Sequence, residues 1–336
     1  MKTPVFAIDV GYGNTKYAWR AASGTIATGM FPSLAPLAAN RALSTYGENV
    51  LTARKVVSVT IDRIDYEVGP DVSLTAAYGN TGRALADNFV LSDNYAALLA
   101  GALHFSGATH IERLVLGLPV HNLKRYENAL KERFYGTLDF GLGSITVEKV
   151  VVVPQPLGSL ILASANRQNE FGRDSAHLVV DVGYFTTDWL YANGFAMDDR
   201  RSDGVPGGAS QIYQRIAGLI ARDEGEQVDD IELIDKALRE RTPFFFYGKN
   251  IDLAPYLEQS RPLVAGIVKE MQNNVGRLTN ARSIILSGGG AALYASEIRA
   301  AFPRVLIELI DSPCLANARG FLAVGEASLA RDRRER

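Results

Sequence analysis

Short apolar runs alternate with segments of helical periodicity along the first half of the chain. The run at 5–8 predicts a buried strand, 15–19 predicts its hairpin partner, and 25–31 predicts a third strand. The stretch 32–49 is rich in Pro, Ala and Asn and is typical of a surface insertion. The same pattern then predicts helices at 94–105 and 122–134 and strands at 113–120 and 145–156.

The second half repeats this order of elements. Its predicted elements are strands at 177–183 and 185–192, a helix at 208–220, an acidic helical region at 223–241, an amphipathic helix at 261–275 and a strand at 283–290. The last residues, 331–336, are expected to form a frayed basic tail. Strands that alternate with helices predict an α/β architecture with two similar lobes.

One short sequence occurs twice. Residues 7–16 read AIDVGYGNTK and residues 179–188 read VVDVGYFTTD, and five of the eight positions from each Asp onward are identical. Trp19 and Trp189 also lie in matching strands, where core packing is their simplest role. A repeat at equivalent strand ends indicates internal duplication.

The repeated Asp-x-Gly turn suits phosphate binding. Glycine lacks the Cβ that would block approach, so the N–H groups of the turn can face a phosphate. An Asp at the end of the strand would need a cation between itself and the phosphate, and hydrated Mg²⁺ is the obvious choice. Lys16 could add a positive charge, and Asn14 and Thr15 could add donors. Either copy alone could also be only a hairpin turn; two copies favour a site that holds one nucleotide from both sides and closes on it.

A third motif is the stretch IILSGGGAALY at 284–294, with three glycines between a strand and a helix. Such a turn lets a base or phosphate lie directly on the backbone beside a helix N-terminus. It is not a Walker A motif and lacks the G-x-G-x-x-G spacing of a dinucleotide fold. By itself it could be only a tight turn.

Length and composition limit the classes of protein and of partner that fit this chain. A length of 336 residues predicts two domains, and 47% hydrophobic with 21% charged residues is ordinary for a globular protein. Because 35 Lys and Arg nearly balance 37 Asp and Glu, direct binding to nucleic acid or to an anionic membrane is not expected. The lone Cys314 forms no internal disulfide, no apolar window is long enough to span a membrane, and no signal peptide is evident, so a cytoplasmic protein is expected.

These three motifs, in this order, resemble those of the actin, sugar-kinase and heat-shock-chaperone ATPase superfamily. DVGYGNTK resembles its first phosphate loop, DVGYFTTD its second and LSGGGAAL its adenosine loop. VVVPQPLGSL at 151–160 and ANARGFLAVGE at 316–326 are similar to its connecting segments, so the resemblance covers nearly the whole chain. LVLGLPVHNLKRYENALKERF at 114–134 is most similar to plasmid-segregation actins of the ParM or StbA type and their archaeal relatives.

The resemblance implies an actin-like fold, with two duplicated lobes, a central mixed sheet flanked by helices and a nucleotide cleft between the lobes. It implies lobe I at 1–160 plus 313–336 and lobe II at 161–312. It implies ATP or GTP with Mg²⁺ as the bound groups, and Mg²⁺ held through water by Asp9 and Asp181. The implied nucleotide-binding residues are Gly11, Tyr12, Gly13, Asn14, Thr15, Lys16, Gly183, Tyr184, Thr186, Thr187, Gly207, Gly208, Gln211, Gly288, Gly289 and Gly290.

Gln155 lies where the superfamily places the residue that positions the attacking water. Many relatives carry Glu there, whereas actin carries Gln. An amide cannot accept a proton at neutral pH, so Gln155 would only orient and polarise the water, and hydrolysis would be slow. Its simplest alternative role is that of a polar residue that ends a strand before proline.

The leading expectation is therefore a slow ATPase or GTPase that assembles into filaments with nucleotide, as in plasmid segregation, with a ParR-like DNA-binding adaptor as partner. Two alternatives stay open. A small-molecule kinase of the same superfamily would need a carboxylate base, for which Asp188 or Asp203 could serve. A monomeric regulator switched by nucleotide would keep the fold without assembly.

Overall fold

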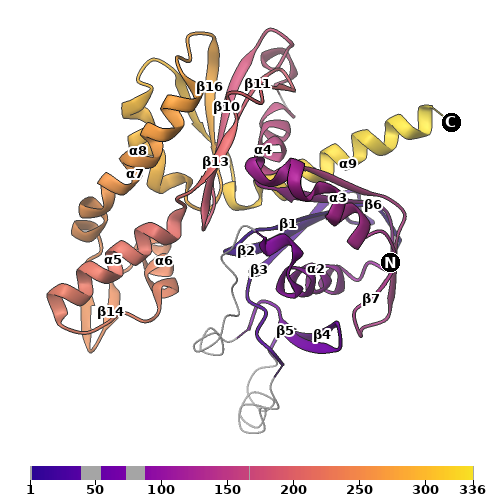
Figure 1. The fold of residues 1–336 in the computed structure, drawn as a ribbon, viewed down its shortest axis with the longest axis horizontal. Coiled ribbons are helices and arrows are strands. Elements are labelled where there is room, and N and C mark those ends of the chain that lie inside the picture. Colours follow the sequence, from indigo (N-terminus) through magenta and orange to yellow (C-terminus); the bar gives the residue numbers. More distant parts are fainter. Residues whose placement is uncertain (1, 39–53, 73–87, 166, 336) are drawn as a thin grey trace. The chain divides into compact units, whose positions relative to one another are not determined.

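The chain folds into two compact units (Figure 1). Unit 1 comprises Met1–Gln168 and Asp311–Arg336, and unit 2 comprises Asn169–Ile310. The computed structural model describes residues 2–38, 54–72, 88–165 and 167–335. Residues 39–49 of the expected insertion lie outside the described residues.

Unit 1 is built on a seven-stranded mixed sheet. Its strands are β1 (Lys2–Val10), β2 (Asn14–Arg20), β3 (Ile26–Pro32), β6 (His110–Leu118), β7 (Gly136–Asp139), β8 (Ser144–Val147) and β9 (Val150–Pro154). The order is β3-β2-β1-β6-β8-β7, and β9 also pairs with β6. β2 is antiparallel to β1, whereas β6 is parallel to β1 and β9 is parallel to β6. The strand expected at 145–156 is interrupted only at Glu148 and Lys149, because β8 and β9 pair in parallel with β6 in one register, and it ends at Pro154.

Helices cover both faces of this sheet. They are α2 (Asp93–Ser106), α3 (Leu123–Arg133), α4 (Gln155–Ser164) and α9 (Ala316–Arg334), and β4 (Val57–Ile61) and β5 (Ile64–Val68) form a separate hairpin. Val5 of β1 packs in one cluster with Phe321 of α9. The ring of Phe6, which points to the other face, lies 6.0 Å from that of Tyr17, and Tyr17 continues the aromatic contacts toward Phe31 and α2. α9 and α2 therefore lie on opposite faces.

The C-terminal residues continue α9 to Arg334, so the expectation of a frayed basic tail is wrong. The side chain of Asp332 accepts hydrogen bonds from Arg113 at 2.9 Å and from Lys149 at 3.0 Å. Arg333 reaches Glu112 at 2.9 Å. These partners are far away in the sequence, so the local composition of the tail could not reveal them.

The contacts of Asp332 predict a pH dependence of stability. Hydrogen bonds from Arg113 and Lys149 lower the pKa of Asp332 to about 2 from 3.8. Because the pKa is depressed in the folded state, the carboxylate stabilises the fold above about pH 4 and loses this effect as the pH falls toward 2. We expect Asp332→Asn to lower the urea midpoint at pH 7 and to change it much less at pH 2.5. An equal change at both pH values would contradict this assignment.

Unit 2 has a six-stranded mixed sheet with the order β12-β11-β10-β16-β17, and β13 pairs with β11. Its strands are β10 (Ala176–Val182), β11 (Thr186–Asn193), β12 (Ala196–Met197), β13 (Asp203–Pro206), β16 (Ala281–Ser287) and β17 (Leu306–Leu309). Its helices are α5 (Ala209–Glu224), α6 (Ile231–Glu240), α7 (Ala254–Val275) and α8 (Ala291–Ala301), and β14 (Phe244–Phe246) and β15 (Lys249–Ile251) form a hairpin. α7 begins earlier than the expected residue 261 and contains Pro262 inside it.

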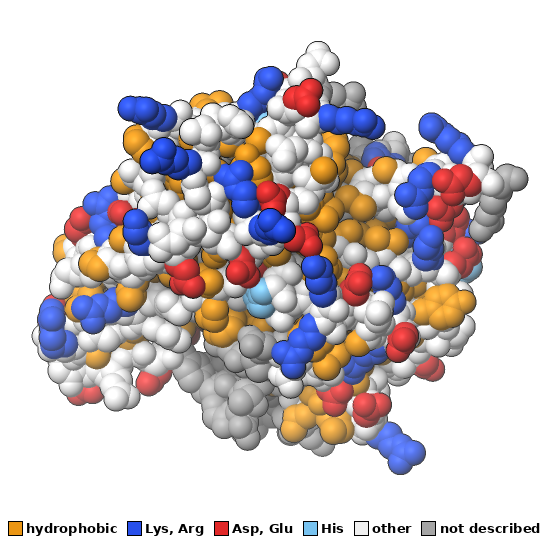
Figure 2. Space-filling view, turned by 45° about the horizontal axis from the view of Figure 1, so that its top comes forward, with side chains coloured by type: hydrophobic (Ala, Val, Ile, Leu, Met, Phe, Trp, Pro, Cys, Tyr) orange, Lys and Arg blue, Asp and Glu red, His pale blue; other side chains and the backbone are white. Residues whose placement is uncertain are grey.

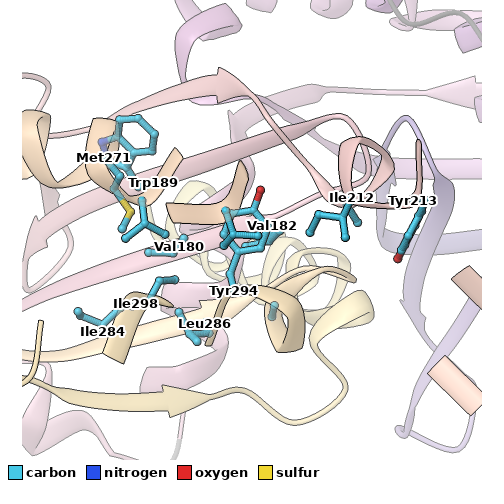
Figure 3. Close-up of a cluster of buried hydrophobic side chains, with 14 of the residues drawn as sticks. Val180, Val182, Trp189, Ile212, Tyr213, Met271, Ile284, Leu286, Tyr294 and Ile298 are labelled. Carbon is cyan, nitrogen blue, oxygen red and sulfur yellow. The ribbon is translucent and has the colours of Figure 1, made fainter. Parts of the chain in front are cut away.

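A large hydrophobic cluster of unit 2 lies on one face of its sheet, and Val179, Leu190 and Ile285 are buried on the other face. Val180 and Val182 of β10 point into this cluster with Trp189 and Tyr294 (Figure 3). Because side chains alternate along a strand, Asp181 points to the other face. The core thus fixes the orientation of the aspartate at the end of the strand.

Candidate functional site

The first Asp-Gly turn connects β1 to β2 and places a buried charge beside a cation. Asp9 is 1% exposed, and Lys16 lies directly opposite it in the antiparallel register. Lys16 Nζ lies 3.1 Å from Asp9 Oδ2, and Gln155 Nε2 donates to Asp9 Oδ1 at 2.8 Å. Three of the residues that sequence analysis selected are therefore in direct contact.

The backbone of this turn is held by its own hydrogen bonds. The N–H of Gly11 donates to the carbonyl of Asn14 at 3.2 Å, and the carbonyl of Gly13 accepts from Ser33 at 2.9 Å. The hydroxyls of Thr15 and Ser33 are 2.9 Å apart and buried. A Cβ on Gly11 would lie 2.9 Å from Lys16 Nζ, so glycine keeps the lysine close to the turn.

Gln155 is the first residue of α4 and does not end a strand. Pro154 precedes it as the N-cap, and helix geometry directs its side chain toward Asp9. Gly117 makes room for it, because a Cβ there would lie 3.1 Å from Gln155 Cγ and 2.4 Å from the ring of Phe321. Gln155 thus directly follows the end of β9, and its amide contacts Asp9.

The second Asp-Gly turn repeats the backbone bond of the first. Gly183 donates to the carbonyl of Thr186 at 2.9 Å, which is the same three-residue spacing as in the first turn. Asp181 is 6% exposed, and the residue opposite it in register is Asp188, where the first turn has Lys16. Asp188 accepts a hydrogen bond from Thr186 Oγ1 at 2.8 Å. Because Asp188 takes the place of Lys16, this turn is the more acidic of the two. Two like charges directly opposite each other on paired strands are unfavourable.

The Gly207-Gly208 segment packs directly against the second turn. The N–H groups of Gly207 and Gly208 both donate to the carbonyl of Phe185, at 2.9 Å and 3.0 Å. A Cβ on Gly208 would lie 2.5 Å from the backbone of Tyr184, which leaves no space for a side chain. Thr187 Oγ1 donates to the carbonyl of Gly207 at 2.6 Å. Gln211 lies just inside α5 and is half-buried.

The triple-glycine loop packs against the same turn. Gly288 has φ +84°, and its Cβ would lie 2.3 Å from the carbonyl oxygen of Val182 and 2.4 Å from Asp181 Oδ1. Gly290 donates to the carbonyl of Val182 at 2.9 Å, and Gly289 is exposed. Unit 2 thus brings the second turn and both glycine segments together, at the start of α5 and α8.

Sequence reasoning missed Tyr294 and Glu232, which support this arrangement. The hydroxyl of Tyr294 donates to the carbonyl of Gly207 at 2.6 Å, and the hydroxyl of Tyr184, which the sequence did single out, donates to Glu232 at 2.6 Å. Tyr12 in the first turn instead stacks on Phe89, with ring centroids 5.0 Å apart. The shared tyrosine of the two turns was a visible signal, but its partners are distant in sequence.

Two family descriptions match consecutive parts of the chain. A sequence model of "Actin like proteins N terminal domain" matches residues 7–158, and one of "Archaeal actin homologue MreB-like, C-terminal" matches residues 179–300. The chain belongs to the actin-like proteins. None of the curated proteins matches the sequence of this actin-like protein.

Similar solved structures confirm the expected actin-like fold over nearly the whole length of this chain. A 15-stranded ParM filament from Clostridium botulinum is 22% identical with TM-score 0.76 and covers 97% of this chain and 100% of its own. Ta0583, an archaeal actin homolog in complex with ADP, is 23% identical with TM-score 0.73 over 96% and 99% of the chains. An AlfA filament bound to AMPPNP is 16% identical with TM-score 0.60 over 98% and 99%. No helix in the described part of the chain is long and apolar enough to cross a bilayer.

Proposed function

We propose that the chain binds one nucleoside triphosphate through both Asp-Gly turns, hydrolyses it slowly and assembles into filaments under the control of the nucleotide. The repeated turn carries this proposal. In both copies a buried aspartate ends a strand, and the following glycine is held by a bond to the residue three positions on. Three similar structures support it: Ta0583 is in complex with ADP, AlfA is a filament bound to AMPPNP, and ParM from Clostridium botulinum is a filament.

The charges at the two turns suggest different roles. Lys16 compensates Asp9 and offers a positive charge to phosphate oxygens beside the amides of the first turn. In the second turn, Asp181 and Asp188 lie opposite each other on paired strands. Their like charges repel, so this turn is better suited to a cation. We expect phosphate contacts at Gly11–Lys16 and Gly183–Thr187.

Magnesium fits the donor set of these turns. Among the described residues, no group of three or more His, Cys, Asp or Glu could hold a metal ion directly. Mg²⁺ keeps several of its waters and uses one or two carboxylates together with phosphates, which suits one aspartate at each turn. Asp9 and Asp181 would hold it through its waters, and the ion would neutralise charge on the phosphates.

Gln155 is proposed to orient the attacking water. Donation from Nε2 to Asp9 fixes the amide plane and makes Oε1 the acceptor that a water can use. Because the amide takes no proton, this arrangement supplies orientation alone, and slow turnover follows.

This role predicts a selective loss of turnover. We expect Gln155→Ala to lower kcat roughly 10- to 100-fold while nucleotide affinity changes less than about threefold. Phosphate release and nucleotide titration on the same preparation measure the two quantities. If kcat is unchanged, or if affinity falls as much as kcat, Gln155 does not position the water.

The two glycine segments are proposed to bind base and ribose. Gly288, Gly289 and Gly290 would lie against the base, and Gly207, Gly208 and Gln211 would contact the ribose. These contacts are made through backbone and shape, so they do not by themselves select ATP or GTP. Parallel titrations with both nucleotides decide the preference.

Plasmid segregation is the proposed setting, with a ParR-like adaptor that contacts DNA. Lys, Arg, Asp and Glu side chains are mixed across the face in Figure 2, which does not suit direct, non-specific DNA binding. The adaptor proposal is tested by copurification with filaments and with plasmid DNA.

A kinase reaction is less well supported by the candidate bases. Asp188 is 2% exposed, and its Oδ2 accepts a hydrogen bond from Thr186. Asp203 lies in β13 and accepts a hydrogen bond from the N–H of Gly204. Neither arrangement favours proton transfer from a substrate hydroxyl.

The assembly part of the proposal is tested by sedimentation and electron microscopy of the full chain with Mg²⁺ and ATP, GTP or no nucleotide. We expect pelleted filaments with one triphosphate and disassembly after hydrolysis. Nucleotide binding without filaments at any concentration would favour a monomeric regulator.

A further inference from the structure

Three hydroxyl side chains of the second turn donate to acceptors within unit 2. The donor–acceptor distances are 2.6 Å from Tyr184 to Glu232, 2.8 Å from Thr186 to Asp188 and 2.6 Å from Thr187 to the carbonyl of Gly207. A hydroxyl has one hydrogen to donate, so in this arrangement the three side chains do not donate to a phosphate. The phosphate contacts of this turn therefore fall to its backbone N–H groups, and the three side chains hold the turn in place.

The hydrogen bond from Tyr184 joins the second turn to the start of α6. Its acceptor, Glu232, lies in the first turn of this helix, and Asp230 caps the helix by accepting from the N–H of Glu232 at 3.0 Å. Asp235 lies three residues further on and therefore on the same face, where it accepts from the hydroxyl of Tyr213 of α5 at 2.6 Å. The ring centroids of Tyr184 and Tyr213 are 6.4 Å apart. Two neighbouring tyrosines thus hold one face of α6.

These two bonds are important for α6 because the helix buries little apolar surface. Two of its ten residues, Ile234 and Ala237, are buried. A helix of this length is marginal by itself, and a segment with few buried apolar contacts opens locally at a low cost in free energy. Burial and the nearby Asp235 carboxylate raise the pKa of Tyr213, so its hydroxyl stays a donor at neutral pH. The tyrosine–carboxylate bonds therefore contribute much of what keeps α6 in place.

We propose that Tyr184 is a positioning residue that couples phosphate binding at the second turn to α6 through Glu232. The inference rests on the proposed function, because it names how that nucleotide site is connected to the rest of unit 2. Backbone bonds from the first turn of α5 to the carbonyls of Gly183 and Tyr184, at 3.0 Å and 2.9 Å, already hold the turn on α5. Phosphates bound to the N–H groups of the turn restrict its backbone further. The bond from Tyr184 passes this restriction to Glu232, so α6 opens less often when nucleotide is bound.

Hydrogen exchange followed by mass spectrometry, below the concentration at which light scattering rises, tests this coupling. In the natural chain, a saturating non-hydrolysable triphosphate with Mg²⁺ should slow exchange roughly threefold or more at residues 183–187 and also at residues 231–240. Tyr184→Phe keeps the ring and removes the hydroxyl. In this variant, saturating nucleotide should still slow exchange at the turn but not in α6. The affinity for nucleotide should fall roughly three- to tenfold, because the turn loses one of the hydrogen bonds that position it.

Tyr213→Phe is the matched control, because it removes the same kind of bond to α6 from a residue outside the turn. Exchange in α6 should be faster with and without nucleotide, the slowing by nucleotide should remain, and the affinity should stay within about twofold of the natural value. Glu232→Gln keeps an acceptor oxygen and should behave nearly as the natural chain does. Glu232→Ala should reproduce Tyr184→Phe, and the double variant should be no weaker than either single variant.

The outcomes separate this inference from the proposed function. If the natural chain binds nucleotide and α6 does not respond, or if α6 responds as strongly in Tyr184→Phe, the inference is wrong and the proposed function stands. If Tyr184→Phe loses affinity and Glu232→Ala does not, Tyr184 contacts the nucleotide directly and the inference is also wrong. If the natural chain binds no triphosphate, the proposed function itself fails. Should Tyr184→Phe not fold, Glu232→Ala and Glu232→Gln provide the same comparison.

Discussion

Asp181→Ala is expected to lower the rate of nucleotide hydrolysis at least about 100-fold. Asp181 is 6% exposed at the end of β10, and Gly288 approaches its Oδ1 so closely that a Cβ would lie 2.4 Å away. The carboxylate is thus aimed at the place where the second turn and the triple-glycine loop meet. Without it, the proposed hydrated Mg²⁺ loses an anchor at the more acidic turn. Phosphate release under saturating Mg²⁺ and nucleotide measures the effect.

Asp203→Asn is the matched control for this change. Asp203 also lies in unit 2, but its carboxylate accepts the N–H of Gly204, which an asparagine can also do. We expect hydrolysis within about twofold of the natural rate. A natural rate in Asp181→Ala would contradict the two-turn site, whereas a large loss in Asp203→Asn would revive the kinase alternative.

Gly320→Ala is expected to destabilise unit 1 by about 3 kcal/mol or more. In the contact between α4 and α9, a Cβ on Gly320 would lie 1.8 Å from the carbonyl oxygen of Gly158 and 2.3 Å from its carbonyl carbon. Both atoms belong to the backbone, so neither can rotate away, and the two helices must separate. Because α4 begins with Gln155, hydrolysis should fall with the packing. Urea unfolding followed by circular dichroism measures the change.

Gly218→Ala provides the comparison within a helix. Gly218 lies in α5, and apart from its chain neighbours and the nearby backbone of its own helix no atom lies within 4 Å of the position that its Cβ would occupy. Alanine should therefore stabilise the helix by up to about 1 kcal/mol through its higher helix propensity. If both variants changed stability in the same direction and by a similar amount, the close helix contact would not be the cause.

The elements with strong periodicity could be predicted from the sequence. The strands that carry the two aspartates and the helices α2, α3 and α5 follow directly from their apolar spacing. The hairpin β14–β15 was missed because its strands, FFF and KNI, are only three residues long and show no alternation. The hairpin β4–β5 could have been predicted, because VSVTI and IDYEV alternate strictly between apolar and polar residues. The extent of α9 was also missed, because its last turn is held by Arg113, Lys149 and Glu112 from the sheet.

The candidate site, too, could be predicted only in part from the sequence. Repetition revealed both Asp-Gly turns, and register then explains why Lys16 meets Asp9. The aligned repeats already place Asp188 at the position of Lys16, but only the strand pairing shows that each of them lies opposite its aspartate. Hydrogen bonds from Gln155 to Asp9 and from Tyr294 to Gly207 join residues from different elements, so no local pattern encodes them.

The number of nucleotides bound per chain tests the central claim most directly. Isothermal titration of the natural chain with Mg²⁺ and a non-hydrolysable triphosphate, below the concentration at which light scattering rises, gives this number. If the two turns hold the same phosphates, one nucleotide binds per chain. Two nucleotides per chain would mean that each turn has a ligand of its own, and no binding of either ATP or GTP analogues would mean that the turns are only hairpins.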